Sequence, residues 1–444
     1  MNDQAAHSGR LVGSASTGLR GIIQVPGDKS MSHRALLFGA MAEGETKITG
    51  LLEGEDVLRM ATAVEALGAK VRRTGDGSWR VEGGPWHSAD APLDCGNSGT
   101  AARLLMGAVA GMAIEARFTG DRSLSSRPMR RVLAPLEAMG ARLVDGDSDR
   151  LPLTVKGGSL NGISYRNEAA SAQIKSAILL AGLHAQGEVE VIEPRPSRDH
   201  SENMLRSFGC DVESMDRHGE RFIRLGERRH LKASDVEIAG DPSSAAFPLV
   251  AALITPNSEV TVRNVLLNPL RTGLFATLEE MGADIVVANR RVRDGEWVGD
   301  VTARTSRLKS VEVPAQRAPS MIDEYPILGI AAAFAHGRSI MHGLAELRVK
   351  ESDRLAAIVA GLTACGVAAR SEEDSLVVEG QGTAPAGGCD VTTHGDHRLA
   401  MSFLVMGQAS GAPVTVDEAE MIATSFPGFA DLMHSLGARI EAGA

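Results

Sequence analysis

Residues 65–71 read EALGAKV, and close variants of this phrase return five times along the chain. The copies are EAMGARL at 137–143, RSFGCDV at 206–212, EEMGADI at 279–285, TACGVAA at 363–369 and HSLGARI at 434–440. Glycine suits the C-terminus of a helix because it accepts the left-handed conformation that a β-carbon penalises. Each copy therefore predicts a helix end, a glycine cap and the start of a short strand.

A second phrase keeps the same rhythm, with a polar opening and then a run rich in alanine and leucine. It occupies residues 30–44, 97–111, 171–187, 241–257, 322–337 and 396–411. Ser, Asp and Asn are preferred N-caps, and runs that are apolar nearly all round are typical of buried helices. A strand-like stretch follows each run, at 46–51, 114–120, 189–194, 259–265, 339–344 and 413–419.

The two phrases together divide the 444 residues into six similar α/β units of about 70 residues, longer than the repeats of common solenoids. Three plus three such units would make two similar domains. Six near-regular copies of both phrases make coincidence a poor explanation.

Composition excludes several classes of protein. The formal net charge is −10 and aromatic residues are only 3% of the chain, so we expect no nucleic-acid partner. The longest apolar stretches, such as 245–254, are far too short for a membrane helix. The first residues lack the apolar core of a secretory signal, and we expect 1–18 to be a disordered lead-in.

The four cysteines, Cys95, Cys210, Cys365 and Cys389, form no C-x-x-C pair. This spacing disfavours a structural zinc site, and scattered free thiols are typical of a reducing cytoplasm. Signatures of ATP-, NAD- and zinc-dependent enzymes are also absent, so we expect no cofactor and no metal.

The residues suited to chemistry lie at the starts of the six apolar runs. They are Lys29, Ser30 and Arg34; Asn97 to Thr100; Ser171 and Gln173; Asp241 to Ser244; Asp323; and Asp396 to Arg398. A helix N-terminus attracts anions through its unpaired N–H groups and partial positive charge. Capping alone would explain one such start, but six starts with extra Lys, Arg, Gln or His indicate an anion site.

Three loops add further cations, at 120–131, 193–200 and 346–354. Lys350 and Arg354 are four apart and would share a face of a helix, with Glu351 beside them as a candidate acid–base group. Arginine binds carboxylate and phosphate through two parallel hydrogen bonds, so these loops suit a substrate that carries both groups.

Nine segments then carry a resemblance to a known family. They are PGDKSMSHRALL (26–37), GNSGTAARL (96–104), SRP (126–128), SAQIKSAILLAG (171–182), GDPSSAAFPLVAAL (240–253), MIDEYPIL (321–328), RVKESDRL (348–355), HGDHRLAMSF (394–403) and ATSFPGF (423–429). Together they closely resemble the 5-enolpyruvylshikimate-3-phosphate synthases, or 3-phosphoshikimate 1-carboxyvinyltransferases, in the bacterial class II spelling. The resemblance runs from about residue 19 to about residue 440.

The resemblance implies an α/β fold of two similar inside-out α/β barrel domains, each made of three βαβαββ units. It places residues 27–239 in an N-terminal lobe, and 19–26 with 240–444 in a C-terminal lobe. The active site is then expected in the cleft between the lobes.

The reaction implied is transfer of the enolpyruvyl group of phosphoenolpyruvate to the 5-hydroxyl of shikimate 3-phosphate, with release of phosphate. This step belongs to the shikimate pathway, which makes chorismate and the aromatic amino acids. We expect a cytoplasmic, monomeric transferase whose partners are these two anionic substrates. They carry about six negative charges if each phosphate is near −2, which explains the many cations.

The resemblance also assigns residues. Lys29, Asp323 and Glu351 are the expected catalytic groups: Asp323 would accept the 5-hydroxyl proton and Glu351 would transfer a proton at C3, although the roles could be exchanged or shared with Lys29. Shikimate 3-phosphate would bind Lys29, Ser30, Arg34, Ser171, Ala172, Gln173, Arg198, Asp323 and Lys350. Phosphoenolpyruvate would bind Lys29, Gly99, Arg127, Gln173, Arg354 and Arg398.

Three positions depart from the family pattern. Ala172 replaces a serine found in some members, Glu346 stands where many have asparagine, and residues 423–427 lack the lysine of the usual late phrase. A phosphoenolpyruvate-binding cation is therefore missing or supplied elsewhere. The family also places the inhibitor glyphosate beside Gly99, so we expect Gly99→Ala to weaken glyphosate binding more than phosphoenolpyruvate binding.

Two alternatives remain at this point. The sister enolpyruvyl transferase that acts on UDP-N-acetylglucosamine shares the repeats but uses a loop cysteine, which the loop near 119–130 lacks. A non-catalytic anion-binding homologue should have lost Lys29, Asp323 or Glu351, and the chain has all three.

Overall fold

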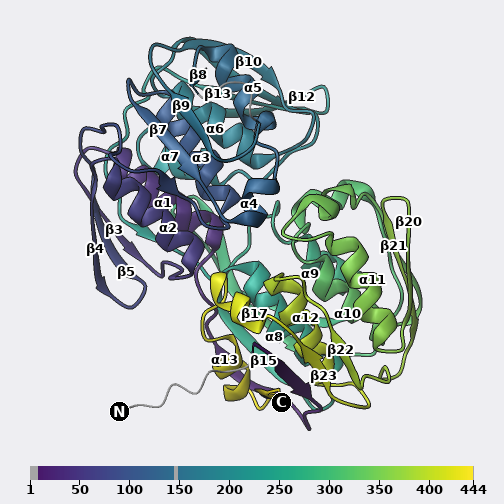
Figure 1. Ribbon diagram of the computed structural model, residues 1–444. Coiled ribbons are helices and arrows are strands. Elements are labelled where there is room, and N and C mark those ends of the chain that lie inside the picture. Colours follow the sequence, from purple (N-terminus) through teal and green to yellow (C-terminus); the bar gives the residue numbers. More distant parts are fainter. Residues whose placement is uncertain (1–8, 145–148, 444) are drawn as a thin grey trace. The chain divides into compact units, whose positions relative to one another are not determined.

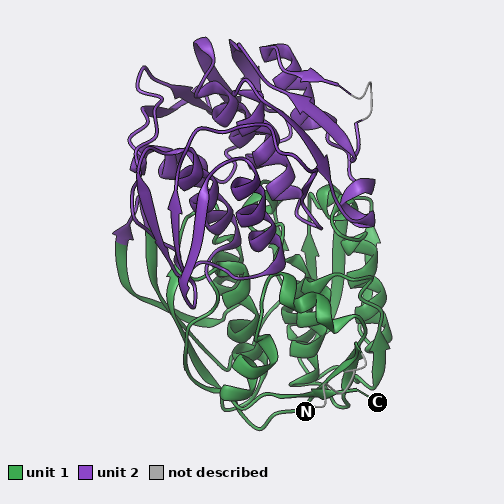
Figure 2. Ribbon diagram, turned by 60° about the vertical axis from the view of Figure 1, so that its left-hand side comes forward, with its two compact units in different colours: residues 1–26, 240–291, 297–444 green, residues 27–239, 292–296 purple. Residues whose placement is uncertain are grey.

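The computed structural model describes residues 9–144 and 149–443. These residues form two compact units, which Figure 2 colours separately. Unit 1 takes its described residues from 1–26, 240–291 and 297–444, and unit 2 takes its own from 27–239 and 292–296. The chain therefore changes unit after Pro26 and after Ala239. Residues 292–296 also belong to unit 2, although the segments on both sides of them belong to unit 1, and the sequence does not indicate this.

Each unit has its most apolar helices on the inside (Figure 1). They are α1 (Lys29–Met41), α3 (Gly99–Ala110) and α6 (Ala172–Gly182) in unit 2, and α8 (Pro242–Ile254), α10 (Tyr325–Phe334) and α12 (His397–Gly407) in unit 1. Beyond the first turn almost every residue of these helices is buried. The prediction of buried helices at the second phrase is confirmed.

Glycine lets two of these helices pack closely. A β-carbon at Gly107 of α3 would lie 2.5 Å from the Cα of Ala177 in α6, a separation that no larger residue permits. The two backbones therefore approach directly, which fixes the starts of both helices relative to each other.

A second set of helices ends at the six glycines of the first phrase. They are α2 (Glu55–Ala66), α5 (Arg130–Met139), α7 (His200–Ser207), α9 (Gly273–Glu280), α11 (Arg354–Ala364) and α13 (Phe429–Ser435). The glycine that follows each helix has a positive φ, between 84° at Gly282 and Gly366 and 118° at Gly68. Helix, glycine cap and strand follow one another as predicted.

In the described part of unit 2, strands form three four-stranded sheets outside the helices. The sheet orders are β14–β3–β5–β4, β6–β7–β9–β8 and β10–β11–β13–β12. In each sheet the first pair is parallel and the other pairs are antiparallel, which is the pairing of a βαβαββ unit. The strands are β3 (Glu45–Thr49), β4 (Lys70–Gly75), β5 (Ser78–Glu82), β6 (Leu93–Asp94), β7 (Glu115–Thr119), β8 (Arg142–Leu143), β9 (Leu153–Lys156), β10 (Asn161–Arg166), β11 (Gln186–Glu193), β12 (Val212–Arg217), β13 (Glu220–Leu225) and β14 (Val236–Glu237).

Unit 1 repeats this plan over its described residues, with sheet orders β2–β15–β17–β16, β18–β19–β21–β20 and β22–β23–β1–β24. Its strands are β1 (Leu11–Ser14), β2 (Arg20–Ile23), β15 (Glu259–Leu266), β16 (Asp284–Arg293), β17 (Glu296–Arg304), β18 (Glu312–Val313), β19 (His336–Met341), β20 (Ala368–Glu372), β21 (Ser375–Gln381), β22 (Cys389–Val391), β23 (Val414–Val416) and β24 (Arg439–Ala442). The predicted fold of two inside-out α/β barrels, each with three repeats, is confirmed.

The disordered lead-in expected at 1–18 is wrong for its described part. Leu11–Ser14 form β1, which pairs antiparallel with β23 and β24 and supplies the strand that the last repeat lacks. Gly13 permits this because a β-carbon there would lie 2.5 Å from the Leu404 carbonyl oxygen. Residues 1–8 of that prediction lie outside the described residues.

The remaining helical segments are short: α4 (Arg122–Ser126), η1 (Ala315–Ser320), η2 (Ala345–Val349) and η3 (Ala419–Thr424). Across residues 9–144 and 149–443, no helix has both the length and the apolar character needed to span a bilayer.

Candidate active site

In unit 2 the starts of the three buried helices are joined by side-chain hydrogen bonds. Ser98, the N-cap of α3, lies 3.3 Å from His33 Nε2 of α1. Gln173 of α6 donates to Thr100 of α3 at 3.0 Å. Arg34 of α1 donates to Ser176 of α6 at 2.8 Å. The positive ends of three helix dipoles therefore share one region of the unit, which favours an anion there.

Arg34 is a fixed cation within this region. It is 3% exposed, and its guanidinium donates to the hydroxyls of Ser201 and Ser176 and to the Ser30 carbonyl at 2.7–2.9 Å. Burial lowers the pKa of Arg34 to about 10, against the attraction of Glu202 and Asp28. The side chain still carries its charge at neutral pH, and its partners hold it in one orientation.

His33 lies beside Arg34 and is fully buried. Burial, with Lys29 and Arg34 as further causes, lowers the pKa of His33 well below its usual value. The ring is therefore neutral at pH 7, and His33 packs between α1 and α3 without adding a charge.

Gly99 and two arginines form the next part of the region. Arg103 donates to the Gly99 carbonyl at 3.3 Å and to Gln173 Oε1 at 2.9 Å. Arg127 donates to Asn97 at 2.8 Å and to Ser123 at 3.1 Å, whereas its buried Nε has no partner among the described residues. A β-carbon on Gly99 would lie 2.6 Å from Arg103 Nη1 and 3.6 Å from Arg127 Nη1. The glycine thus leaves space between two guanidinium groups.

Lys29 is the first residue of α1, and its ammonium group lies 2.5 Å from the Asp56 carboxylate of α2. The two side chains are 18% and 9% exposed. The preceding residue, Asp28, caps the helix by accepting from the Met31 N–H at 2.8 Å. The helix start and Asp56 therefore fix the position of the lysine.

A buried cluster supports the loop that follows β11. Lys175 of α6 is fully buried and lies 3.0 Å from Glu193 and 2.8 Å from Glu202. Burial lowers the pKa of Lys175, but the two carboxylates outweigh it and the net shift is upward. Glu193 also accepts from the Ser197 N–H at 3.0 Å, so the cluster holds the residue next to Arg198.

Ser171 is the N-cap residue of α6, yet its hydroxyl makes no capping hydrogen bond. Asn167 donates to the Ser171 carbonyl at 3.0 Å and to Glu193 at 2.9 Å. The turn before α6 is thus held through the same buried carboxylate, while the Ser171 hydroxyl is not used for capping.

In unit 1 the starts of the three buried helices are joined mainly through carboxylates. Ser243 of α8 donates to Glu324, the N-cap residue of α10. Arg398 of α12 lies 3.9 Å from the same Glu324 and 3.4 Å from the Asp323 carbonyl. Arg271 bonds Asp241, the N-cap of α8, at 2.9 Å. The helix starts of this unit therefore combine cations with acids.

Asp323 forms ion pairs with two cations, one at the end of η2 and one at the start of α11. Its Oδ1 lies 3.4 Å from Lys350 Nζ and 3.2 Å from Arg354 Nη1. Lys350 closes η2 and Arg354 begins α11, so the two residues do not share a helix face as their spacing suggests. Asp323 brings them together instead, and its side chain is 14% exposed.

Arg354 is the most buried cation of this cluster, at 0% exposure. It lies 2.6 Å from Asp396 and 2.5 Å from Glu351, in addition to its contact with Asp323. Burial lowers the pKa of Arg354, but the three carboxylates outweigh it and raise the pKa above its ordinary value. The arginine thus holds two of the expected catalytic carboxylates in one place.

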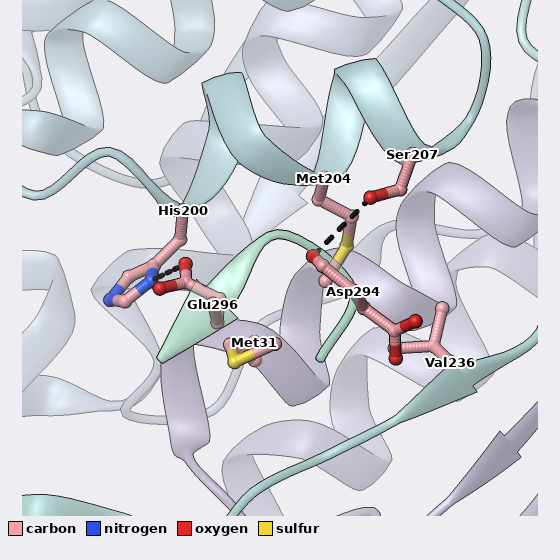
Figure 3. Close-up of a pocket in the computed structure, with 7 residues that line it drawn as sticks. All are labelled: Met31, His200, Met204, Ser207, Val236, Asp294 and Glu296. Carbon is pink, nitrogen blue, oxygen red and sulfur yellow. Dashed lines mark hydrogen bonds and ion pairs between the residues drawn. The ribbon is translucent and has the colours of Figure 1, made fainter. Parts of the chain in front are cut away.

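Residues 292–296 add a buried contact to unit 2, shown in Figure 3. His200 Nδ1 lies 2.8 Å from Glu296, and Asn203 donates to the same oxygen at 3.2 Å. A cavity of about 10 Å³ beside them has room for one water. Ligand atoms of Asp199, His200 and Glu296 lie within 4.8 Å of one another and could hold a metal ion. Because His200 and Asn203 already engage Glu296, we interpret the cluster as a structural contact.

Comparisons with known proteins agree with one another. The family model described as EPSP synthase (3-phosphoshikimate 1-carboxyvinyltransferase) matches residues 14–433. The 3-phosphoshikimate 1-carboxyvinyltransferase of Caulobacter vibrioides is 59% identical over 427 residues, 95% of this chain and 96% of that protein. The enzyme of the same name from Acidiphilium cryptum is 59% identical over 433 residues, 97% of each.

The chain belongs to the EPSP synthase family. Solved structures agree: EPSP synthase from Acinetobacter baumannii matches with a TM-score of 0.87 and 41% identity, over 98% of this chain and all of that one. The enolpyruvyl transferase NikO from Streptomyces tendae matches with a TM-score of 0.76 over 97% of this chain and 98% of that one. At 19% identity the second likeness shows the fold alone.

The structure distributes the residues expected from the EPSP synthase family over the two units. Those in unit 2 are Lys29, Ser30, Arg34, Gly99, Arg127, Ser171, Ala172, Gln173 and Arg198, and those in unit 1 are Asp323, Lys350, Glu351, Arg354 and Arg398. Within unit 1 all five belong to the cluster around Arg354 and Asp323. Within unit 2 the residues lie at or near the starts of α1, α3 and α6, except Arg127 and Arg198, which lie on loops.

The sequence analysis did not identify several side chains that contact the site residues expected from the EPSP synthase family. Arg103 could have been found, because it lies one helical turn after Gly99. Asp56 and Lys175 gave no signal, since their partners are distant in sequence or fully buried. Conversely, Arg130 and Arg348 of the basic loops pair with nearby Glu137 and Asp353 and contribute to the surface.

Proposed function

We propose that the chain transfers the enolpyruvyl group of phosphoenolpyruvate to the 5-hydroxyl of shikimate 3-phosphate and releases phosphate. Membership of the EPSP synthase family supports this reaction. The observation that carries it is the cluster of Asp323, Glu351 and Lys350 around the buried Arg354. A cluster that holds two carboxylates among cations can bind an anion and also move protons.

Shikimate 3-phosphate takes its hydrogen bonds from residues of both units in this proposal. In unit 2, Ser30, Arg34, Ser171, the Ala172 backbone, Gln173 and Arg198 hold its phosphate and hydroxyl groups, with Lys29 shared between the substrates. In unit 1, Asp323 and Lys350 hold the hydroxyl that reacts. Two observations support this assignment: the guanidinium of Arg34 is held in one orientation, and the hydroxyl of Ser171 makes no capping hydrogen bond.

Phosphoenolpyruvate binds Lys29, Gly99, Arg127 and Gln173 of unit 2, and Arg354 and Arg398 of unit 1. Two features of unit 2 support the first group: the space that Gly99 leaves between two guanidinium groups, and the unpartnered Nε of Arg127. Arginine suits both the carboxylate and the phosphate of this substrate because each can accept two parallel hydrogen bonds.

Asp323 accepts the proton of the 5-hydroxyl, and Glu351 transfers a proton at C3 of phosphoenolpyruvate. Lys350 and Arg354 keep Asp323 in position for the hydroxyl. Arg354 also lies 2.5 Å from Glu351, so an incoming anion that engages Arg354 competes with that ion pair and frees the carboxylate for proton transfer. Lys29 is the alternative group for either step.

The proposal is tested by phosphate release from phosphoenolpyruvate with each of two acceptors, shikimate 3-phosphate and UDP-N-acetylglucosamine. Release with the first alone, with a product whose mass equals both substrates minus phosphoric acid, supports it. Release with the second alone assigns the sister activity. Tight binding of shikimate 3-phosphate without any release makes the chain a non-catalytic homologue.

We further propose that the enzyme acts in the cytoplasm as a monomer. The four cysteines are all unpaired by disulfides, which suits a reducing compartment. Sedimentation of the purified chain at several concentrations tests the second statement, and a mass that doubles with concentration contradicts it.

A further inference from the structure

Two cysteines that are distant in sequence meet in unit 1. Cys365 follows α11 as its C-cap residue, and Cys389 is the first residue of β22. Their sulfur atoms lie 2.9 Å apart. The other two cysteines instead face backbone carbonyls of their own neighbourhood: Cys95 faces Leu93 and Cys210 faces Asp211, each at 3.8 Å.

The backbone, and not a chance side-chain orientation, keeps this pair together. The Gly387 N–H donates to the Cys365 carbonyl at 3.2 Å, two residues before Cys389. Gly387 has a φ of +66°, and a β-carbon there would lie 2.2 Å from the Ala412 carbonyl oxygen, so the close turn depends on glycine. Cys389 itself pairs with Val414 in the sheet.

The remaining separation is small on the scale of a covalent link. A disulfide has an S–S distance of about 2.05 Å, so the two sulfurs need to approach by less than about 1 Å. Rotation of the two side chains can supply this movement while the hydrogen bonds of Gly387 and of β22 stay in place.

We propose that Cys365 and Cys389 are a redox-active pair, which closes to an intrachain disulfide by exchange with a small-molecule disulfide such as oxidised glutathione. Cys389 is the partly exposed member and Cys365 is fully buried. The entering molecule can therefore reach Cys389 first, and Cys365 acts as the resolving thiol.

The exchange proceeds in two balanced steps. The Cys389 thiolate attacks one sulfur of oxidised glutathione, forms a mixed disulfide and expels one glutathione thiolate, which takes up the proton that Cys389 lost. Cys365 then loses its proton, attacks Cys389 Sγ, forms the intrachain bond and expels the second glutathione. The two cysteines are oxidised by two electrons, and one oxidised glutathione is reduced to two thiols.

The second step is expected to be the slow one. Burial, together with the neighbouring Cys389 thiol, raises the pKa of the Cys365 thiol, so little of it is thiolate at neutral pH. The mixed disulfide on Cys389 should consequently be seen at early times and should decay as the intrachain bond forms.

The disulfide would join two segments that already meet at their other ends. Arg354 at the start of α11 pairs with Asp396 at the start of α12, and the cysteines lie at the end of α11 and in β22. The bond would close a loop of about 24 residues and stabilise unit 1. Because it leaves the Arg354–Asp396 pair intact, we expect turnover to be retained.

The test exposes the full-length chain to oxidised glutathione, quenches it with acid, and alkylates the remaining thiols with N-ethylmaleimide under denaturing conditions. We expect two alkylated thiols out of the four cysteines at equilibrium, with no retained glutathione. Trypsin cuts after Arg370, between the two cysteines, so the disulfide should appear as two linked peptides that separate on reduction. The melting temperature of the oxidised chain should exceed that of the reduced chain by several degrees.

Matched variants assign the bond. Cys365→Ala should retain one glutathione on Cys389, whereas the Cys95→Ala/Cys210→Ala double variant should still lose both remaining thiols to the disulfide. Four alkylated thiols in the wild-type chain after equilibration would overturn the proposal. A permanent glutathione adduct on wild-type Cys389 would overturn it too, because Cys365 would then have failed to resolve it.

Discussion

Two buried arginines, Arg34 in unit 2 and Arg354 in unit 1, experience opposite surroundings. The hydrogen-bond partners that the described residues give Arg34 are serine hydroxyls and a carbonyl, and burial lowers its pKa to about 10. Arg354 meets the carboxylates of Asp396, Glu351 and Asp323, and its pKa is raised although burial opposes this. The hydrogen bonds of Arg34 go to neutral groups, and Glu202 and Asp28 only attract it electrostatically, whereas Arg354 forms ion pairs with three acids.

The different surroundings of the two arginines indicate different roles for the two units. A buried cation with only neutral partners has lost its hydration without gaining an ion pair, so an entering phosphate restores part of that loss. A cation already paired with three carboxylates gains less from an anion, but it positions groups that exchange protons. Unit 2 is thus suited to binding, and unit 1 is suited to acid–base chemistry.

The variant Asp323→Asn tests most directly whether unit 1 carries the acid–base chemistry. The amide keeps the size of the carboxylate but cannot accept the hydroxyl proton, so we expect kcat to fall by roughly 10²–10⁴-fold. The KM for shikimate 3-phosphate should change much less. Steady-state phosphate release measures both values.

Asp353→Asn is the matched control for that variant. Asp353 lies one residue before Arg354, but it caps α11 and pairs with Arg348 at the surface. Its amide should leave kcat within a few-fold of the wild type. An Asp323→Asn enzyme with full turnover would remove that carboxylate from the mechanism and end the acid–base assignment of unit 1.

The next effect concerns stability and compares the two arginines directly. Arg354→Met leaves three carboxylates close together without their cation, and we expect it to lower the free energy of unfolding by about 3–5 kcal/mol. Arg34→Met should cost far less, because Ser176 and Ser201 already lie 2.7 Å apart and can bond each other. Urea denaturation of both variants gives the comparison.

Arg34→Met should instead weaken binding. Loss of a charged hydrogen-bond donor is worth about 1.5–3 kcal/mol, so we expect the KM for shikimate 3-phosphate to rise by roughly 10–100-fold. Equal losses of stability in the two arginine variants would show that the contrast between the units has no energetic basis.

The sequence predicted those features of the fold that are decided locally. A glycine after a helix readily adopts a positive φ, and an Asp before a helix is a preferred cap, so Gly68, Gly282, Asp241 and Asp396 marked the elements correctly. Pairings between distant segments carry no such local mark. Neither the place of Leu11–Ser14 beside β23 and β24 nor the place of residues 292–296 in unit 2 could be inferred.

The same distinction applies to the site. Gln173 and Arg398 stood out because they follow helix starts, whereas their partners depend on how helices pack. The bond from Arg103 to Gln173 spans 70 residues, and the contact between Cys365 and Cys389 spans 24. The spacing of Lys350 and Arg354 gave a wrong prediction of a shared helix face. The two side chains come together because both pair with the carboxylate of Asp323.

Gly99→Ala is expected to have a smaller effect that separates two ligands. The added methyl group would lie 2.6 Å from Arg103 Nη1, so the guanidinium must shift and its bond to Gln173 must weaken. Glyphosate is longer than phosphoenolpyruvate, so the methyl should raise its inhibition constant by roughly 10-fold or more, for a clash of about 1–3 kcal/mol. The KM for phosphoenolpyruvate should rise less.

Gly158→Ala serves as its control, because a β-carbon there meets nothing within 4 Å. Inhibition assays against phosphoenolpyruvate measure both constants. Equal losses for the two ligands would show that Gly99 shapes the binding region as a whole and does not discriminate between them.

The smallest expected effect is the pH dependence that His33 gives to unit 2. Its pKa in the folded chain is well below the value of 6.5 expected for the unfolded chain. Between these two values the unfolded state binds more protons, so acid favours unfolding. The contribution of His33 to stability is therefore complete above about pH 7 and declines as the pH falls through the unfolded value.

His33→Gln removes this proton while keeping a polar side chain near Ser98. We expect the wild-type chain to lose more stability than the variant between about pH 7.5 and about pH 5.5 in urea denaturation. Burial is the first cause of the lowered pKa, with Lys29 and Arg34 adding to it, so the effect reports mainly on the dry surroundings of the ring and secondarily on the two neighbouring cations. Parallel pH profiles for the two chains would show that His33 is protonated equally in both states, and burial would then not exclude the charged form of the ring.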